Sequence, residues 1–231
     1  MKRLAVSLFV MGLLLVGATA WSARRDVASG TQMVQAAEGF VKSLDDSQRS
    51  KAVMSYDSPE RRDWHFIPKP TRKGLQVHEM NSDQRKQAHA LLQSALSQVG
   101  YDKATKIMSL EALLAELEKT RTNGPLRDPL RYYFTVFDQP SMDGRWGLSV
   151  EGHHLSLNFV VDHGKVISST PMTFAANPAI VKTDVVASIP KGTRILEREE
   201  SLAMDLLASL TPEQRDVAVI AEKAPAEMRA A

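Results

Sequence analysis

The spacing of apolar residues changes along this 231-residue chain from a helical period to a strand period. Up to about residue 120, apolar residues recur every three or four positions, as they do on one face of a helix. Between 131 and 170, runs rich in aromatic and β-branched residues are separated by short turns, which is typical of antiparallel strands. The helical spacing returns over 195–224. The pattern predicts an α+β fold, in which an antiparallel meander of about four strands packs against N-terminal helices (32–120) and C-terminal helices.

Three segments with one local pattern predict the starts of helices. Each has a capping residue, Asp45, Asn81 or Thr211, with a Gln three positions later. The side-chain oxygen of the cap can accept from an amide of the first turn, while the Gln reaches back to the amide of the cap. The repetition reflects either convergent capping or a distant internal duplication. The irregular spacing of the segments argues against a solenoid.

Residues 1–20 have the three parts of a secretory signal peptide. Two cations, Lys2 and Arg3, precede an apolar stretch over 4–16, and the small residues at 18–20 form a cleavage site. We predict cleavage after Ala20 and export to the periplasm or the extracellular space. Contact with a membrane is expected only through the signal peptide before cleavage. A flexible start over 21–31 then leads into a single domain over 32–231.

The alternative interpretation of this leader is an uncleaved membrane anchor. In that case Arg24 and Arg25 would lie on the far side of the membrane, against the usual distribution of positive charge. Cleavage therefore remains the prediction.

Charge and cysteine content exclude several classes of protein. Removing Lys2 and Arg3 from the 29 Lys and Arg residues leaves 27, which equals the 27 Asp and Glu residues. A neutral mature chain gives no reason to expect nucleic acid as a partner. The chain has no cysteine, so it has neither a disulfide nor a thiolate for catalysis or metal binding. We predict no cofactor; a metal site built from His, Asp or Glu is the alternative.

The run from Gly152 to Phe159 carries the candidate functional residues. Side chains alternate along a strand, so His154, Ser156 and Asn158 should project from one face. This row of an imidazole, a hydroxyl and an amide, with Trp146 at its rim, is predicted to bind a small polar molecule or a peptide. The alternative is an ordinary solvated sheet face, which antiparallel sheets often have.

The adjacent pair His153 and His154 also invites a metal interpretation. Neighbouring strand residues point to opposite faces, so the two imidazoles should not share one ion unless a bulge at Gly152 reorients them. Glu151 and His153 fall on the same face, and we expect them to form a structural hydrogen-bonded pair.

Several motifs together resemble an uncharacterised family of exported bacterial proteins, a domain of unknown function. The most specific is Gly-His-His-Leu-Ser-Leu-Asn-Phe, and the others are Trp64-x-Phe66-x-Pro68, Arg145-Trp146-Gly147, Thr170-Pro171-Met172 and Ala176-Asn177-Pro178-Ala179. The resemblance covers most of the mature chain and implies location and fold, but no reaction. Members of the family usually continue beyond the residues seen here at 221–227, so the resemblance also implies that this chain is truncated at its C-terminus.

Three functions remain open from the sequence. The favoured one is an exported binding module for a small polar ligand or peptide, which uses the row that begins at His154. The second is a hydrolase with His154 as general base and Ser156 or Asn158 orienting the substrate. The third is a structural or interaction protein of the cell envelope, in which the helices form the contact surface.

Overall fold

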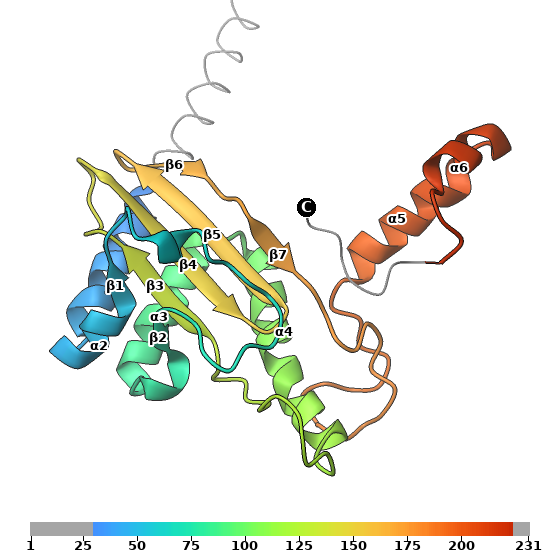
Figure 1. Cartoon of the computed structure of the whole chain (residues 1–231), viewed down its shortest axis with the longest axis horizontal. Helices are drawn as coiled ribbons and strands as arrows, with labels where there is room; N and C mark the ends of the chain where they lie inside the picture. The colour runs from blue at the N-terminus through green and yellow to red at the C-terminus, as the bar shows by residue number, and fades with distance from the viewer. Residues whose placement is uncertain (1–29, 224–231) are drawn as a thin grey trace, which may run out of the picture.

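The computed structural model describes residues 30–223 of the chain (Figure 1). The predicted signal peptide and residues 21–29 lie outside the described residues. The first described element is a helix over 30–43, so the prediction of a flexible start was wrong for residues 30 and 31. Its apolar positions, among them Met33, Ala37 and Phe40, are buried in the main core, which explains why this segment is ordered as a helix.

The remaining helices follow the predicted order. Their bounds are α2 Asp46–Ala52, η1 Pro59–Arg61, η2 Val77–Glu79, α3 Ser82–Ala95, α4 Gln98–Leu117, α5 Glu197–Ser209 and α6 Pro212–Ala218. The three predicted helix starts are confirmed, because Asp45, Asn81 and Thr211 each form a complete capping box. Two of these boxes also meet in space: Gln84 Nε2 donates to Gln48 Oε1 over 2.6 Å and so links the N-termini of α3 and α2.

A mixed seven-stranded sheet forms the centre of the domain. The strands are β1 Val53–Met54, β2 Leu75–Gln76, β3 Tyr133–Phe137, β4 Arg145–Gly152, β5 Leu155–Asp162, β6 Lys165–Ser168 and β7 Met172–Phe174. The predicted antiparallel meander is present as β3 to β6. The prediction of about four strands was incomplete, since β1 pairs in parallel with β3, β2 pairs with β3 and β7 pairs with β5. These three strands have two or three residues each, too few for alternation to be visible in the sequence.

One face of the sheet is apolar and packs on the helices. Trp146 pairs with Val161 and Leu148 with Phe159, and all four side chains are buried. They belong to one core cluster with residues of the first helix, α3 and α4, which cover this face (Figure 1). The α+β architecture with helices on one side of the sheet is therefore confirmed.

The C-terminal helices do not cover the sheet, so that part of the prediction was wrong. Neither α5 nor α6 has a buried residue, and both extend away from the sheet in Figure 1. Leu202 and Leu206 are 58% and 65% exposed. An ion pair between Lys103 and Glu199 connects α5 to α4. The apolar face of the sheet is occupied instead by the first helix, α3 and α4.

Candidate functional site

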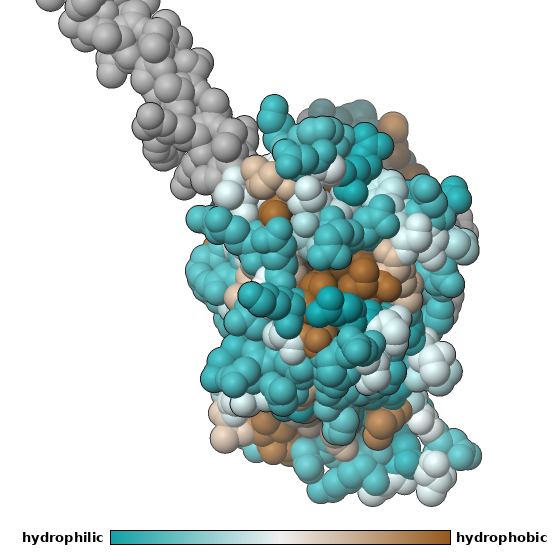
Figure 2. All heavy atoms as spheres, turned by 90° about the vertical axis from the view of Figure 1, so that its left-hand side faces the viewer, coloured by the Kyte–Doolittle hydropathy of each residue, from teal (hydrophilic) through white to brown (hydrophobic). Residues whose placement is uncertain are grey.

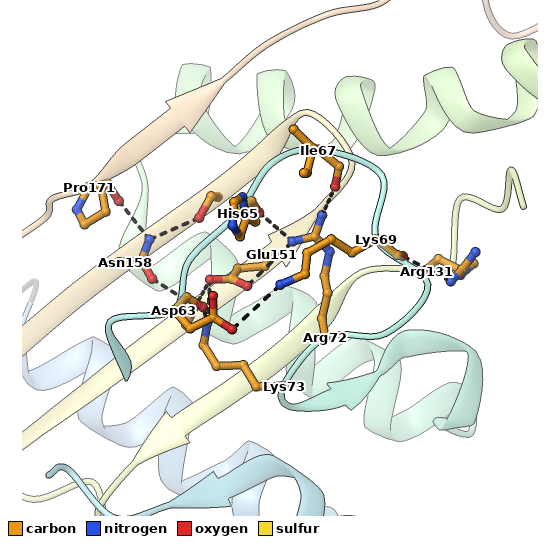
Figure 3. A network of polar contacts seen from close by, with 12 residues as sticks. Asp63, His65, Ile67, Lys69, Arg72, Lys73, Arg131, Glu151, Asn158 and Pro171 are labelled. Atoms are coloured by element: carbon orange, nitrogen blue, oxygen red, sulfur yellow. Dashed lines mark hydrogen bonds and ion pairs between the residues drawn. The ribbon is translucent and has the colours of Figure 1, made fainter. Parts of the chain in front are cut away.

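The polar face of the sheet is covered by a long loop. We call residues 55–74, which connect β1 to β2, the strap. In Figure 3 the strap crosses over β4 and β5, on the face opposite to the helices. Arg72 fixes the path of the strap, because its guanidinium donates to the carbonyls of His65 and Ile67. Lys73 donates to the carbonyl of Asp63.

Beneath the strap lies a buried ionic cluster. Glu151 accepts a hydrogen bond from Lys73 Nζ over 2.7 Å, and Arg72 Nη1 lies 3.8 Å from its other oxygen. The three side chains are each at most 5% exposed. A buried carboxylate is stable only when it is paired, so Glu151 anchors both the strap and the two cations at its end.

Ser156 and Asn158 do share one face of β5, as the alternation predicts, but their polar groups are used within the protein. Asn158 Nδ2 donates to Ser156 Oγ over 3.2 Å and to the carbonyl of Pro171 over 2.9 Å. Ser149 Oγ lies 2.9 Å from Asn158 Oδ1. Ser156 is fully buried, so this face is not the solvated one that the alternative interpretation expects. The row forms a closed hydrogen-bond network that joins β4, β5 and the segment before β7.

The structure places Trp146 away from this network. Trp146 pairs with Val161 across the β4–β5 ladder, on the apolar face, and is fully buried. Its expected position at the rim of a polar site was wrong, because Asn158 projects from the opposite face of the sheet. Its indole nitrogen is buried without a hydrogen-bond partner.

His153 and His154 lie in the two-residue turn between β4 and β5, not on the strand. The predicted strand therefore begins two residues later, at Leu155. His154 has a φ of 62°, in the left-handed region that a non-glycine residue seldom adopts. Its amide donates to the carbonyl of Phe66 in the strap, and its carbonyl accepts from the amide of Ala175. The turn is thus fixed on two sides, and the two imidazole rings lie 3.9 Å apart.

His154, the predicted general base, is poorly placed for proton transfer at neutral pH. Both of its ring nitrogens are buried without a hydrogen-bond partner. Burial penalises the charged imidazolium, and His153 and Arg127 add repulsion, so the pKa of His154 falls to about 4. A base with so low a pKa has little tendency to take a proton at pH 7.

The expected pair between Glu151 and His153 was wrong, because each residue has a different partner. Glu151 belongs to the cluster under the strap, whereas His153 Nδ1 lies 2.5 Å from Oε1 of Glu111. Glu111 is a buried residue of α4, 42 positions earlier in the chain. The turn places the imidazole of His153 beyond the end of the sheet, where it contacts α4. The strand alternation that would put His153 on the same face as Glu151 therefore does not hold for this residue.

Arg127 and Tyr132 complete the surroundings of His153. The guanidinium of Arg127 makes two hydrogen bonds to Glu118, at 2.9 and 3.2 Å, and its Nη1 lies 3.0 Å from His153 Nδ1. The hydrogen bonds from Arg127 lower the pKa of Glu118. Tyr132 is fully buried and donates from its hydroxyl to the carbonyl of His153 over 2.8 Å. Gly152 makes this possible, since a Cβ there would lie 2.1 Å from the tyrosine ring.

An open cleft of about 660 Å³ lies between the strap and residues 126–131. Its lining comprises Lys51, Met54, Pro70, Thr71, Arg72, Lys73, Gly74, Gln76, His78, Glu79, Leu126, Asp128, Arg131 and Tyr133. A much smaller cavity of about 20 Å³ adjoins it and is lined by Glu111, Arg127, Tyr132 and His153, among others. Four residues line both spaces: Arg72, Leu126, Arg131 and Tyr133. The Glu111–His153 pair therefore lines a small cavity that adjoins the cleft.

Comparison with known families identifies the domain. The family model described as "Protein of unknown function (DUF3500)" matches residues 26–231. The chain belongs to the DUF3500 family. This confirms the resemblance to an uncharacterised domain-of-unknown-function family. No curated protein and no solved structure matches this DUF3500 chain.

Two further findings concern the described part of the DUF3500 chain. Among residues 30–223, no three His, Cys, Asp or Glu residues come together as a metal site would require. No helix within the same range is both long enough and apolar enough to cross a membrane.

Sequence reasoning missed the cleft and the partners of His153. The lining of the cleft is drawn from α2, β1, the strap, β2, η2, β3 and the segment before β3, which no local motif connects. A signal for the turn was present, since Gly152 precedes the two histidines and Gly often marks a tight bend.

Proposed function

We propose that this DUF3500 protein is exported and binds a small organic anion with an apolar part in the cleft beside the strap. The observation that carries the proposal is the lining of this cleft. Lys51, one of its cations, pairs with Glu79, and two others, Arg72 and Lys73, pair with Glu151, which leaves Arg131 as the lining cation without a carboxylate partner among residues 30–223. The volume of the cleft falls within the range of small-molecule sites.

Arg131 is the group best suited to hold the anion. Its Nη2 donates to the carbonyl of Pro70 over 2.8 Å, and its Nη1 donates to the carbonyl of Leu126 over 3.2 Å, so it bridges the two walls of the cleft. A longer contact of 3.5 Å joins Nη2 to the carbonyl of Lys69. A guanidinium has five N–H donors, and these contacts use at most three. The remaining donors can bind a carboxylate or a phosphate, which suit the planar fork of Arg.

The rest of the lining indicates which groups the ligand should have besides its anionic group. Met54, Pro70 and Leu126 are apolar, and Leu126 is 68% exposed. Tyr133 adds a ring, and its hydroxyl accepts from Gln76 Nε2 over 3.1 Å, which leaves the hydroxyl hydrogen free to donate. A ligand with an aliphatic or aromatic body next to its acidic group would match both kinds of surface. Figure 2 shows the side of the molecule that carries α2 and β1, where hydrophilic residues surround a small apolar area.

Export is the second part of the proposal and rests on the leader pattern of residues 1–20. It is tested by sequencing the N-terminus of the protein recovered outside the cytoplasm. The expected mature chain begins at Trp21; an intact leader on protein that stays in the cytoplasm would contradict export.

Binding is tested with a matched pair of probes, 4-phenylbutyrate and its neutral amide. The two have the same body, so only the charge differs. We expect the acid to shift the NMR signals of residues 70–76 and 126–133 and the amide to have little effect. Arg131→Gln should weaken binding of the acid about tenfold or more, since a charge-assisted hydrogen bond contributes about 1.5–3 kcal/mol.

Lys103→Gln is the control, because Lys103 pairs with Glu199 away from the cleft and its loss should leave the affinity unchanged. Equal binding of the acid and the amide, or binding of neither, would contradict the proposal.

A further inference from the structure

The contacts of His153 select one tautomer of its neutral ring. Nδ1 lies 2.5 Å from Glu111 Oε1 and 3.0 Å from Arg127 Nη1. A guanidinium only donates and a carboxylate accepts, so a single Nδ1 cannot serve both. The arrangement that satisfies these groups is an Nδ1–H that donates to Glu111, with Arg127 facing the same carboxylate oxygen at 3.8 Å. In this tautomer Nε2 carries a lone pair and no hydrogen.

The position of His153 makes this lone pair usable. No hydrogen bond within residues 30–223 involves Nε2, and His153 lines the small cavity that adjoins the cleft. A volume of about 20 Å³ is enough for one water molecule, which requires about 10–15 Å³. A carboxylate that orients an imidazole through Nδ1 and leaves Nε2 without a hydrogen bond, in a residue that lines a space for water, is an arrangement suited to a general base.

We propose that His153 is a general base that activates water for the hydrolysis of carboxylate-bearing esters in the cleft. The inference rests on the proposed function, which supplies the anion-binding cleft. In the reaction, Nε2 takes a proton from water while the water oxygen bonds to the carbonyl carbon of the ester. The C–O bond to the alcohol then breaks, and the alcohol leaves with the proton held by Nε2. The products are a carboxylic acid and an alcohol, so the atoms balance.

The neighbours of His153 have separate roles in this reaction. Glu111 is a positioning residue, because it fixes the ring through Nδ1 and stabilises the imidazolium that forms. Arg127 has Nε and Nη2 held by Glu118, so its Nη1 stays on the Nδ1 side of the ring, where it faces the Glu111 carboxylate and helps to fix that carboxylate. His154 packs against one face of the His153 ring, with the ring centroids 3.9 Å apart and the planes tilted by 39°.

The test uses mono-4-nitrophenyl succinate, which has a free carboxylate, and the neutral ester 4-nitrophenyl butyrate. Release of 4-nitrophenolate is followed at pH 7.5 with the whole protein. We expect kcat/KM to be at least about tenfold higher for the succinate. His153→Gln should lower kcat at least about 100-fold, which is the usual contribution of a general base. The control, His163→Asn, changes a histidine of the opposite turn and should keep the wild-type rate.

Glu111→Gln provides a second variant in case His153→Gln does not fold. It keeps the size of the side chain and an acceptor oxygen but loses the charge that stabilises the imidazolium. A positioning role predicts a lower kcat with KM unchanged, and a displaced acid limb in the pH–rate profile. A purely structural role would leave both readouts in place in the folded fraction.

Two results would overturn the inference: no hydrolysis above the buffer rate for either ester, or wild-type turnover by His153→Gln. If 4-phenylbutyrate still binds in the first case, only the hydrolysis is refuted. If it does not bind, the proposed function fails as well.

Discussion

The two turns at the ends of β5 show how burial changes the meaning of one local arrangement. The turn before the strand holds His153 and His154, and the turn after it holds His163 and Gly164. Each turn places one histidine at positive φ, 62° for His154 and 48° for His163. Each also contains a contact between an imidazole and a carboxylate, at 2.5 Å for His153 and 2.7 Å for His163.

The surroundings of the two contacts differ. The partner of His163 is its neighbour Asp162, and the imidazole is 72% exposed, so water screens the pair. The partner of His153 is Glu111 on α4, and both side chains are at most 11% exposed. The contact between histidine and carboxylate is thus exposed to solvent at the turn after β5 and buried at the turn before it. The buried pair also has a fixed arginine and a cavity beside it, which is why we assign function there.

The largest expected effect is a difference in the free energy of unfolding between variants of the two carboxylates, Glu111 and Asp162. Glu111→Ala removes the acceptor of the buried His153 Nδ1–H, while Arg127 keeps its hydrogen bonds to Glu118, and a buried donor left without a partner costs about 1–3 kcal/mol. The free energy of unfolding, measured by urea denaturation, should fall by about this amount. Asp162→Ala also removes the ion pair with the half-exposed Arg145 and should lower the free energy of unfolding by no more than about 1 kcal/mol. Equal losses of unfolding free energy for the two variants would contradict the difference between the buried and the exposed pair.

A smaller effect should appear in the pH dependence of stability. His154 has a pKa near 4 in the folded protein and about 6.5 when unfolded, so the unfolded chain binds more protons between these values. Its contribution to stability is therefore complete above about pH 6.5 and is lost as the pH falls toward 4.

The matched variants are His154→Asn and His163→Asn, since Asn tolerates positive φ. His154→Asn should flatten the dependence between pH 6.5 and 4, and His163→Asn should leave it as in the wild type. A wild-type slope that survives in His154→Asn would show that another group is responsible.

The parts of this fold that could be predicted are those specified by neighbouring residues. The capping boxes at Asp45, Asn81 and Thr211 each need four consecutive residues, and all three are present. The meander β3 to β6 follows from alternation and short turns, and the separation of Ser156 from Leu157 onto opposite faces follows from the same rule.

The remaining features depend on contacts between distant parts of the chain. Glu151 meets Lys73 across 78 positions, and His153 meets Glu111 across 42. Nothing in the spacing of these residues indicates either pair. The strap also changes the interpretation of the polar face of β5. Polar side chains on such a face are often exposed to solvent, but here they lie beneath residues 55–74. Alternation predicted which side chains share a face, but not what covers them.

The most direct test of this account is the tautomer of His153, read from the nitrogen chemical shifts of the imidazoles in two-dimensional NMR. The account predicts that neutral His153 carries its hydrogen on Nδ1, donated to Glu111, while Nε2 is unprotonated. The Glu111→Ala variant should lose this preference. A hydrogen on Nε2 of His153 in the wild-type protein would leave no lone pair to activate water and would contradict the central claim.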